Sequence, residues 1–254
     1  MKNKNLLTCM AAVLCLGTSC SQSYQFAGIT RTRILVDKRY DATHDAKVEA
    51  MMAPYKAHVD SMMSPVVGQL AHDMWKQLPE GTLSNLLPDI LVWGSKAYNE
   101  TPDFGVYNMG GIRAMLSKGK VTKGDIVDIA PFENKICLLT LKGADVIDLF
   151  KQVASIGGAG LSHGVRLVIT KDGKLKSATL NGKEINPEAS YRVVTLDYLS
   201  HGMDGLVAFK KKTNVLSPQD YHSNVRFIIM DYFKDATSKG QVVDAKIEGR
   251  IVIE

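Results

Sequence analysis

The sequence predicts a mixed α/β (α+β) fold, in which helices pack against a mixed sheet. Helix-like and strand-like segments alternate along residues 80–254, which favours a layered α/β arrangement. Hydrophobic residues make up 45% of the 254 residues and charged residues 22%, a composition typical of an ordinary globular protein. No stretch of residues 80–254 is rich enough in Gly, Pro or Ser to act as a linker, so we expect it to form one domain.

The first twenty residues have the features of a lipoprotein signal peptide. Lys2 and Lys4 precede an apolar run over 6–16, which is too short to span a bilayer as a permanent helix. The segment ends in Leu-Gly-Thr-Ser-Cys, which resembles a bacterial lipobox, although Gly17 stands where leucine is commoner. We therefore expect Cys20 to be lipidated and the exported protein to be anchored to the cell envelope, facing the periplasm or cell surface. An ordinary cleaved signal with an incidental cysteine is the alternative.

Helical periodicity dominates the next part of the chain. Apolar residues recur at threes and fours from 44 to 74, which predicts a long helix. A second helical run follows Thr82, and Pro88 inside it is expected to kink the helix or to mark its true start. The segment Arg33–Val36 has weak strand character. The predicted divisions are a signal peptide at 1–20, a leader or linker at 21–44 and a domain at 45–254, of which 45–77 is a joining helix.

The remaining segments alternate between strand-like and helix-like patterns of apolar residues, and turn residues separate them. The pair Asp172-Gly173 between two strand-like runs predicts a hairpin. The expected elements are strands at Phe104–Asn108, Ile136–Leu141, Tyr191–Thr195 and Gly249–Ile253, a hairpin of Val165–Thr170 with Lys174–Leu180, a helical turn at Ile112–Ser117, and helices at Lys142–Val153 and Gln219–Phe233.

Four segments carry polar residues or glycines where a core would not favour them. In the first, Tyr107–Arg113, a strand runs into two glycines and an expected helix start, where free N–H groups attract anions. Arg113 adds a planar cationic group that suits a phosphate or carboxylate. A Gly-Gly pair between a strand and a helix also serves as a plain turn, so this pattern leaves both interpretations open.

The other three segments are also compatible with a planar, polar ligand. Phe132 follows a proline in a polar loop, and Tyr198 precedes a glycine-rich acidic turn. The face of either aromatic side chain can stack on a nucleobase. Asn134 can both donate and accept hydrogen bonds, as a base edge requires. The loop at 160–164 is flexible enough for its backbone to approach a ligand. Plain packing is the alternative for either aromatic residue.

Taken in order and spacing, these segments resemble the C-terminal domain of the 5'-nucleotidase family. The matching patterns are Asn-x-Gly-Gly-Ile-Arg at 108–113, Gly-Asp followed by Pro-Phe-x-Asn at 124–134, a Ser-x-Gly loop at 162–164, Tyr-Arg-Val-Val leading to an aromatic residue and Gly-x-Asp-Gly at 191–205, and Glu-Gly-Arg-Ile at 248–251. The resemblance covers about residues 45–254 and implies a nucleotide-recognition domain.

The resemblance implies a role for each matching residue. Phe132 and Tyr198 sandwich a nucleobase, and tyrosine stands here where phenylalanine is common. Asp204 accepts hydrogen bonds from ribose hydroxyls, and Arg113 faces the phosphate. The other residues implied to line the site are Asn108 and Asn134 at the base edge or ribose, Gly110 and Gly111 in the close-approach turn, and Gly164 with its backbone against the ligand.

Two departures from the family pattern affect the expected activity. Gln77 stands three residues before Glu80, where an arginine is usual, so a nucleoside or an altered ligand is an open alternative to a nucleotide. The family's hydrolytic site holds two metals on Asp, His and Asn side chains of a separate N-terminal domain. Residues before 45 contain no such ligand set, so we expect no catalytic residue, metal site or cofactor in this chain, with divalent metals in a partner subunit.

The charge argues against a nucleic-acid partner, and the cysteine content offers no candidate nucleophile. The net charge of +5 falls to about +3 without Lys2 and Lys4, and no basic stripe indicates a nucleic-acid partner. Cys137, in an apolar run, is expected to be a core residue. The leading interpretation is a specificity subunit that works with a separately encoded metallophosphoesterase in nucleotide catabolism. The alternatives are a stand-alone nucleoside- or nucleotide-binding lipoprotein and a degenerate structural domain.

Overall fold

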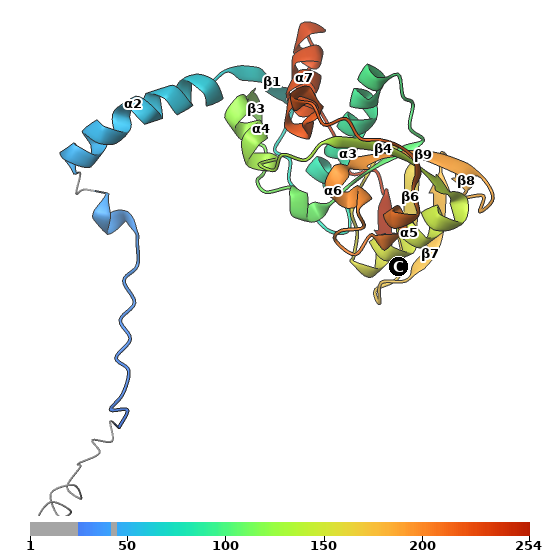
Figure 1. Cartoon of the computed structure of the whole chain (residues 1–254), viewed down its shortest axis with the longest axis horizontal. Coiled ribbons are helices and arrows are strands. Elements are labelled where there is room, and N and C mark those ends of the chain that lie inside the picture. The colour runs from blue at the N-terminus through green and yellow to red at the C-terminus, as the bar shows by residue number, and fades with distance from the viewer. Residues whose placement is uncertain (1–24, 42–44) are drawn as a thin grey trace, which may run out of the picture. The chain divides into compact units, whose positions relative to one another are not determined.

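The computed structural model describes residues 25–41 and 45–254, in two units that comprise residues 1–50 and 51–254 (Figure 1). In the first unit, residues 25–41 are exposed and contain one short 3-10 helix, Lys38–Tyr40 (η1). The strand character predicted at Arg33–Val36 is wrong, because within the described part of this unit no segment pairs with these residues. Cys20 lies outside the described residues.

Helix α2 (Ala46–Met63) is shorter than the periodicity predicts. The prediction of helix up to residue 74 is wrong, because Pro65 cannot continue a helix and restricts the residue before it. Strand β1 (Val66–Leu70) follows directly and pairs antiparallel with β3 (Gly119–Thr122). Short strands of this kind depend on a partner far away in the sequence, which periodicity cannot reveal.

A five-stranded mixed sheet forms the centre of the second unit (Figure 1). The order of its strands is β10-β4-β9-β2-β5. Strands β2 and β9 run parallel, whereas β4 runs antiparallel to β9 from the Ile136–Leu196 pair to the Lys142–Ser190 pair. The bounds are Phe104–Tyr107 (β2), Ile136–Lys142 (β4), Gly160–Leu161 (β5), Ser190–Leu196 (β9) and Thr213–Leu216 (β10).

Two helices cover the opposite faces of this sheet: α3 (Thr82–Gly94) and α5 (Gly143–Ser155). The ring of Phe104 contacts that of Phe150 on α5, with the centroids 5.4 Å apart. The neighbouring Gly105 faces α3, since a Cβ there would lie 2.8 Å from the carbonyl oxygen of Pro88. Successive strand residues point to opposite faces, so both faces are buried. Helix α3 continues through Pro88, and its buried face offsets the one helical hydrogen bond that proline removes.

A second sheet has the order β11-β6-β7-β8. The predicted hairpin around Asp172-Gly173 is confirmed as β6 and β7, and the predicted closing strand β11 runs parallel to β6. Strand β7 also contacts α5, which therefore lies between the two sheets. The bounds are Val165–Ile169 (β6), Leu175–Leu180 (β7), Lys183–Glu184 (β8) and Ile251–Ile253 (β11).

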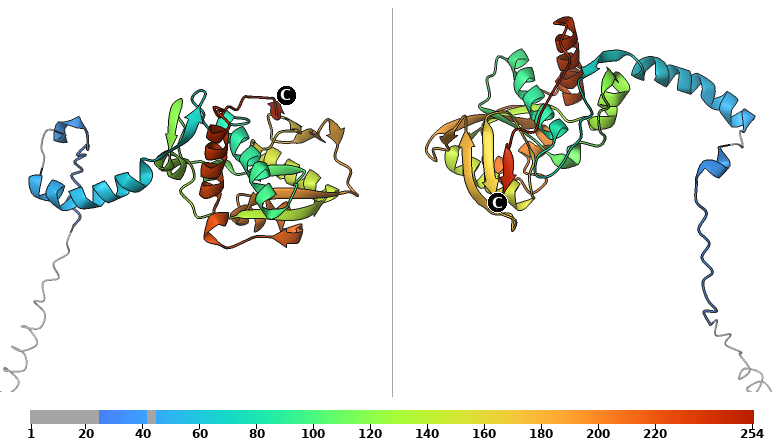
Figure 2. Two further views of the ribbon diagram at one scale, coloured as in Figure 1. Left: turned by 90° about the horizontal axis from the view of Figure 1, so that it is seen from above. Right: turned by 180° about the vertical axis from the view of Figure 1, so that it is seen from behind.

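Helix α7 (Val225–Ser238) packs against α3, β1 and the short helix α4 (Lys123–Ile129), as two further views show (Figure 2). Its N-cap is Asn224, whose Oδ1 accepts the backbone N–H of Arg226 at 3.1 Å. The remaining elements are the helix α6 (Asp197–Ser200) and the 3-10 helices η2 (Ser95–Tyr98), η3 (Met109–Gly111), η4 (Val207–Lys211) and η5 (Tyr221–Ser223).

Candidate functional site

The strand order brings three predicted segments to one edge of the central sheet. Because β2 and β9 are parallel, their carboxyl ends lie at the same edge, where Asn108 follows β2 and Tyr198 follows β9. Because β4 is antiparallel to β9, its amino end lies at that edge too, two residues after Asn134. Segments up to 96 residues apart in sequence therefore meet, as the hydrogen bond between Asn108 and Asp204 demonstrates.

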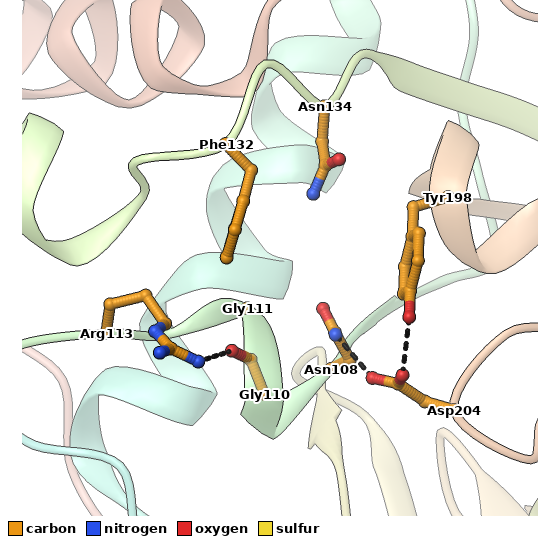
Figure 3. A pocket seen from close by; sticks show the side chains of 8 residues that line it. All are labelled: Asn108, Gly110, Gly111, Arg113, Phe132, Asn134, Tyr198 and Asp204. Atoms are coloured by element: carbon orange, nitrogen blue, oxygen red, sulfur yellow. Dashed lines mark hydrogen bonds between the residues drawn. The ribbon is translucent and has the colours of Figure 1, made fainter. Parts of the chain in front are cut away.

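A pocket of about 320 Å³ lies where these segments meet (Figure 3). Eight of the nine residues that the resemblance implies line it, and we call it the aromatic pocket. The rings of Phe132 and Tyr198 stand on opposite sides of it, and the side chain of Asn134 projects between them (Figure 3). The lining residues are Asn108, Gly110, Gly111, Arg113, Phe132, Asn134, Tyr198 and Asp204.

The two aromatic side chains that wall the pocket are both partly open to solvent. Phe132 is 47% exposed and Tyr198 is 41% exposed. Burying apolar surface is favourable, at roughly 25 cal/mol per Å², so these ring faces gain from a planar ligand that excludes water. Two facing aromatic walls thus provide a stacking site for a flat ring.

Asp204 is held at one side of the pocket by two hydrogen bonds. Asn108 donates from Nδ2 to Oδ2 at 2.5 Å, and the Tyr198 hydroxyl donates to Oδ1 at 2.8 Å (Figure 3). The backbone of Asp204 has a φ of +53°, a conformation that few residues other than glycine adopt. The hydrogen bond and negative charge of Asp204 raise the pKa of Tyr198, which keeps the phenol protonated as a donor.

The floor of the pocket is a tight turn that requires a glycine. A Cβ on Gly111 would lie 2.5 Å from Oδ1 of Asn108, so a side chain there would displace the amide that holds Asp204. The turn continues as an extended segment, and the helical turn predicted at Ile112–Ser117 is wrong. Leu116 instead exchanges two backbone hydrogen bonds with Met74, at 2.8 and 2.9 Å. The expected helix N-terminus for an anion is therefore not formed here.

Positive charge lies beside the same turn. The Cζ atom of Arg113 lies 5.8 Å from the centroid of the Phe132 ring, and its Nη1 donates to the Gly110 carbonyl at 3.4 Å. This position lies across the pocket from Asp204 (Figure 3). The pocket thus has a cationic side beside Phe132 and a carboxylate side beside Tyr198.

Lys76 is a residue at this site that sequence reasoning missed. Its Nζ donates to the carbonyl oxygens of Met109 at 3.0 Å and Ile112 at 2.6 Å, and so holds the turn from outside. Gln77, the departure from the family pattern, lines a different hollow and accepts a hydrogen bond from Trp75 Nε1 at 3.1 Å. Lys76 lies within the predicted joining helix, so no local signal pointed to it.

Arg226 supports the loop that carries Phe132 and was also missed. Its Nη2 donates to the carbonyl oxygen of Pro131 at 2.8 Å, and Val225 N–H donates to the carbonyl oxygen of Asn134 at 2.9 Å. The start of α7 therefore fixes both ends of the Pro131–Asn134 loop. An arginine at a helix start carries no signature of such a contact in sequence.

Gly164 is the one predicted site residue that lies elsewhere. It lines a separate hollow with Arg166 and Asn181, so the expectation that its backbone approaches the ligand of the aromatic pocket is not met. Gly164 has a φ of +89°, and its carbonyl accepts a hydrogen bond from the Asn181 N–H at 2.8 Å. Both features stabilise the open ends of the β6–β7 hairpin. In the same loop, the Ser162 hydroxyl accepts the Gly105 N–H at 2.8 Å.

Three further features were predicted or excluded from the sequence: a metal site, a membrane-spanning helix and the role of Cys137. No group of three or more His, Cys, Asp or Glu side chains within residues 25–41 and 45–254 is placed to hold a metal ion. Within the same ranges, no helix combines the length and apolar character that crossing a membrane requires. Cys137 is buried, as predicted for a core residue, and burial raises the pKa of its thiol.

The chain thus combines a mixed α/β fold with a pocket that has two aromatic walls. The chain belongs to the 5'-nucleotidase C-terminal domain family, whose sequence model matches residues 66–211. The family that the sequence motifs predict is therefore confirmed, and so is the predicted fold class.

The relatives that the chain matches are longer proteins, of which it spans less than half. The chain is 29% identical to Endonuclease YhcR of Bacillus subtilis over 194 residues, 72% of this chain and 16% of that protein. It is 27% identical to an apyrase of Aedes aegypti over 232 residues, 82% of this chain and 39% of that protein. A 5'-nucleotidase precursor from Thermus thermophilus has a similar structure, with a TM-score of 0.69 and 26% identity, over 81% of this chain and 42% of that one.

Proposed function

We propose that the aromatic pocket binds a nucleoside or nucleotide, as the specificity domain of a 5'-nucleotidase-type hydrolase. The observation that carries this proposal is the pair of exposed rings, Phe132 and Tyr198, that face each other beside a fixed carboxylate (Figure 3). A nucleobase would stack between the rings, and Asp204 would accept hydrogen bonds from the ribose. Asn134 and Asn108 would meet the base edge or the sugar, and Arg113 would lie on the phosphate side.

Binding is expected to be weak, because two stacking faces contribute about 1–3 kcal/mol per base and part of that is lost in ordering the ligand. Two faces together contribute roughly 2–6 kcal/mol before that loss, so with added hydrogen bonds from Asn134 and Asp204 we expect dissociation constants in the micromolar-to-millimolar range. Calorimetric titration with adenosine and AMP tests the proposal, with ribose 5-phosphate as the control ligand without a base. A protein that binds no common nucleoside or nucleotide at millimolar concentration would leave only a structural role.

We further propose that a separately encoded metallophosphoesterase supplies the divalent metals and the hydrolytic step. The family relationship and a pocket built for binding support this division of labour. The highly purified chain is expected to release no phosphate from AMP, even with added divalent metal. Metal-dependent release that is lost on substitution of Gly110 or Phe132 would contradict this expectation, because it would tie hydrolysis to this chain's own pocket.

We also propose that the protein is exported and held at the membrane by a lipid on Cys20. The charged start, the apolar run and the small residues before Cys20 support this proposal. Membrane fractionation of the wild type and of Cys20→Ala tests it. The variant is expected to leave the membrane fraction, and an unchanged distribution would rule out lipid attachment at this cysteine.

A further inference from the structure

Two side chains donate hydrogen bonds to the carboxylate of Asp204. One of these donors is the hydroxyl of Tyr198, which phenylalanine at this position would lack. The Tyr198 hydroxyl comes from α6, and the Asn108 amide comes from the turn after β2 (Figure 3). Each donor occupies a different carboxylate oxygen. Rotation of the carboxylate about its Cβ–Cγ bond would therefore break both hydrogen bonds, although Asp204 itself is exposed.

The amide of Asn108 can be assigned one orientation. Nδ2 must face Asp204, because a carboxylate accepts hydrogen bonds and cannot donate them when ionised. Asn108 is only 7% exposed, and its Oδ1 has no hydrogen-bond partner among the described residues. Burying an unpaired acceptor is unfavourable, so the Oδ1 atom of Asn108 destabilises this arrangement. The hydrogen bond from Asn108 to Asp204 acts in the opposite direction.

The two donors leave part of the carboxylate available. Each oxygen of an ionised carboxylate can accept two hydrogen bonds, so each oxygen of Asp204 keeps one acceptor position. Asp204 lines the aromatic pocket, and its two hydrogen bonds restrict rotation of the carboxylate that carries these acceptor positions. Two adjacent hydroxyl groups on the same face of a sugar are the matching donors, whereas a single hydroxyl leaves one acceptor unused.

We propose that the Tyr198 hydroxyl acts as a positioning group, which holds Asp204 so that both hydroxyls of a ribose cis-diol are required for full affinity. This inference rests on the proposed function and adds the sugar class that the pocket selects: ribonucleosides over 2'-deoxy- and 3'-deoxynucleosides. The ring of Tyr198 stacks on the base, and its hydroxyl separately sets the geometry of Asp204. Phenylalanine at this position would keep the stacking face and lose the link to the carboxylate.

The substitution Tyr198→Phe separates these two roles. Dissociation constants are measured by calorimetry for adenosine, 2'-deoxyadenosine, 3'-deoxyadenosine and 2',3'-dideoxyadenosine. The wild type is expected to prefer adenosine over each monodeoxynucleoside by about fivefold or more, the effect of one net hydrogen bond. In Tyr198→Phe this preference is expected to fall at least threefold, with the loss confined to ligands that carry ribose hydroxyls.

Two further variants make the result specific. Asp204→Ala should abolish the preference for adenosine, and Tyr221→Phe, which alters an exposed tyrosine outside the pocket, should leave it unchanged. An unchanged preference in Tyr198→Phe would overturn the inference while the proposed function stands. An equal loss of affinity for dideoxyadenosine would also overturn it, because the hydroxyl would then act on the pocket as a whole. A wild type that binds no nucleoside would overturn both.

Discussion

Replacing Phe132 by alanine is expected to weaken the binding of adenosine by roughly 5- to 150-fold, which corresponds to about 1–3 kcal/mol for one base–aromatic stack. Phe132 forms one whole wall of the aromatic pocket, across from Tyr198 (Figure 3). Its ring is half exposed without a ligand, so truncation removes stacking surface and leaves no large core cavity. Calorimetric titration of the two proteins with adenosine measures the difference.

The matched control for this substitution is Trp75→Ala. Trp75 is 48% exposed, close to the value for Phe132, but it lines a different hollow. Adenosine affinity should stay within about twofold in this variant. Arg113→Ala should cost less than Phe132→Ala for adenosine and more for AMP if the phosphate dominates binding. Equal adenosine affinity in wild type and Phe132→Ala would show that the pocket does not stack a base.

Replacing Arg250 by methionine is expected to lower the free energy of unfolding by about 1–3 kcal/mol, because it leaves the hydrogen-bond acceptors of a partly buried ion-pair network unpaired. Arg250 is 4% exposed and donates from Nη1 and Nη2 to both oxygens of Asp89 at 3.0 and 2.7 Å. It also donates to Glu248 at 2.9 Å and to the Leu161 carbonyl at 2.6 Å. Methionine fills much of the volume but leaves these acceptors unpaired.

Urea-induced unfolding measures this effect, with Arg166→Met as the control. Arg166 is exposed and contacts the same segment, through the backbone carbonyl of Glu248 at 3.0 Å. Its substitution should cost less than about 1 kcal/mol, as expected for a solvent-exposed contact. Similar losses in the two variants would contradict a stabilising role for the buried network. Adenosine affinity of the folded Arg250→Met protein should remain close to wild type, since Arg250 does not line the aromatic pocket.

Some of the fold follows from residues that are close together in the sequence. The hairpin of β6 and β7 could be predicted because Asp172-Gly173 favours a tight turn between two strand-like runs. Helix α5 and strand β4 have clear periods and lie within two residues of their predicted bounds. In each case, propensity and hydrophobic pattern agree with the final packing.

Other parts depend on contacts that no local pattern encodes. Strands β1 and β3 are short, and each is stabilised by a partner about fifty residues away. Periodicity therefore predicts helix past Met63, and the polar-glycine pattern at 109–111 predicts a helix start where the chain forms only a tight turn. Gly164 matches a family motif by sequence, yet the path of the hairpin places it in another hollow.

The sequence by itself determined the class of the protein and the chemical types at its pocket: two aromatic residues, two asparagines, a carboxylate and an arginine. Those types are a property of the residues and their order along the chain. Only the tertiary structure decided that Lys76 and Arg226 support the pocket, and that Tyr198 and Asn108 hold opposite oxygens of Asp204. The physical reason is that side-chain hydrogen bonds depend on distances of about 3 Å, which the order and direction of β2, β9 and β4 set across as many as 96 residues.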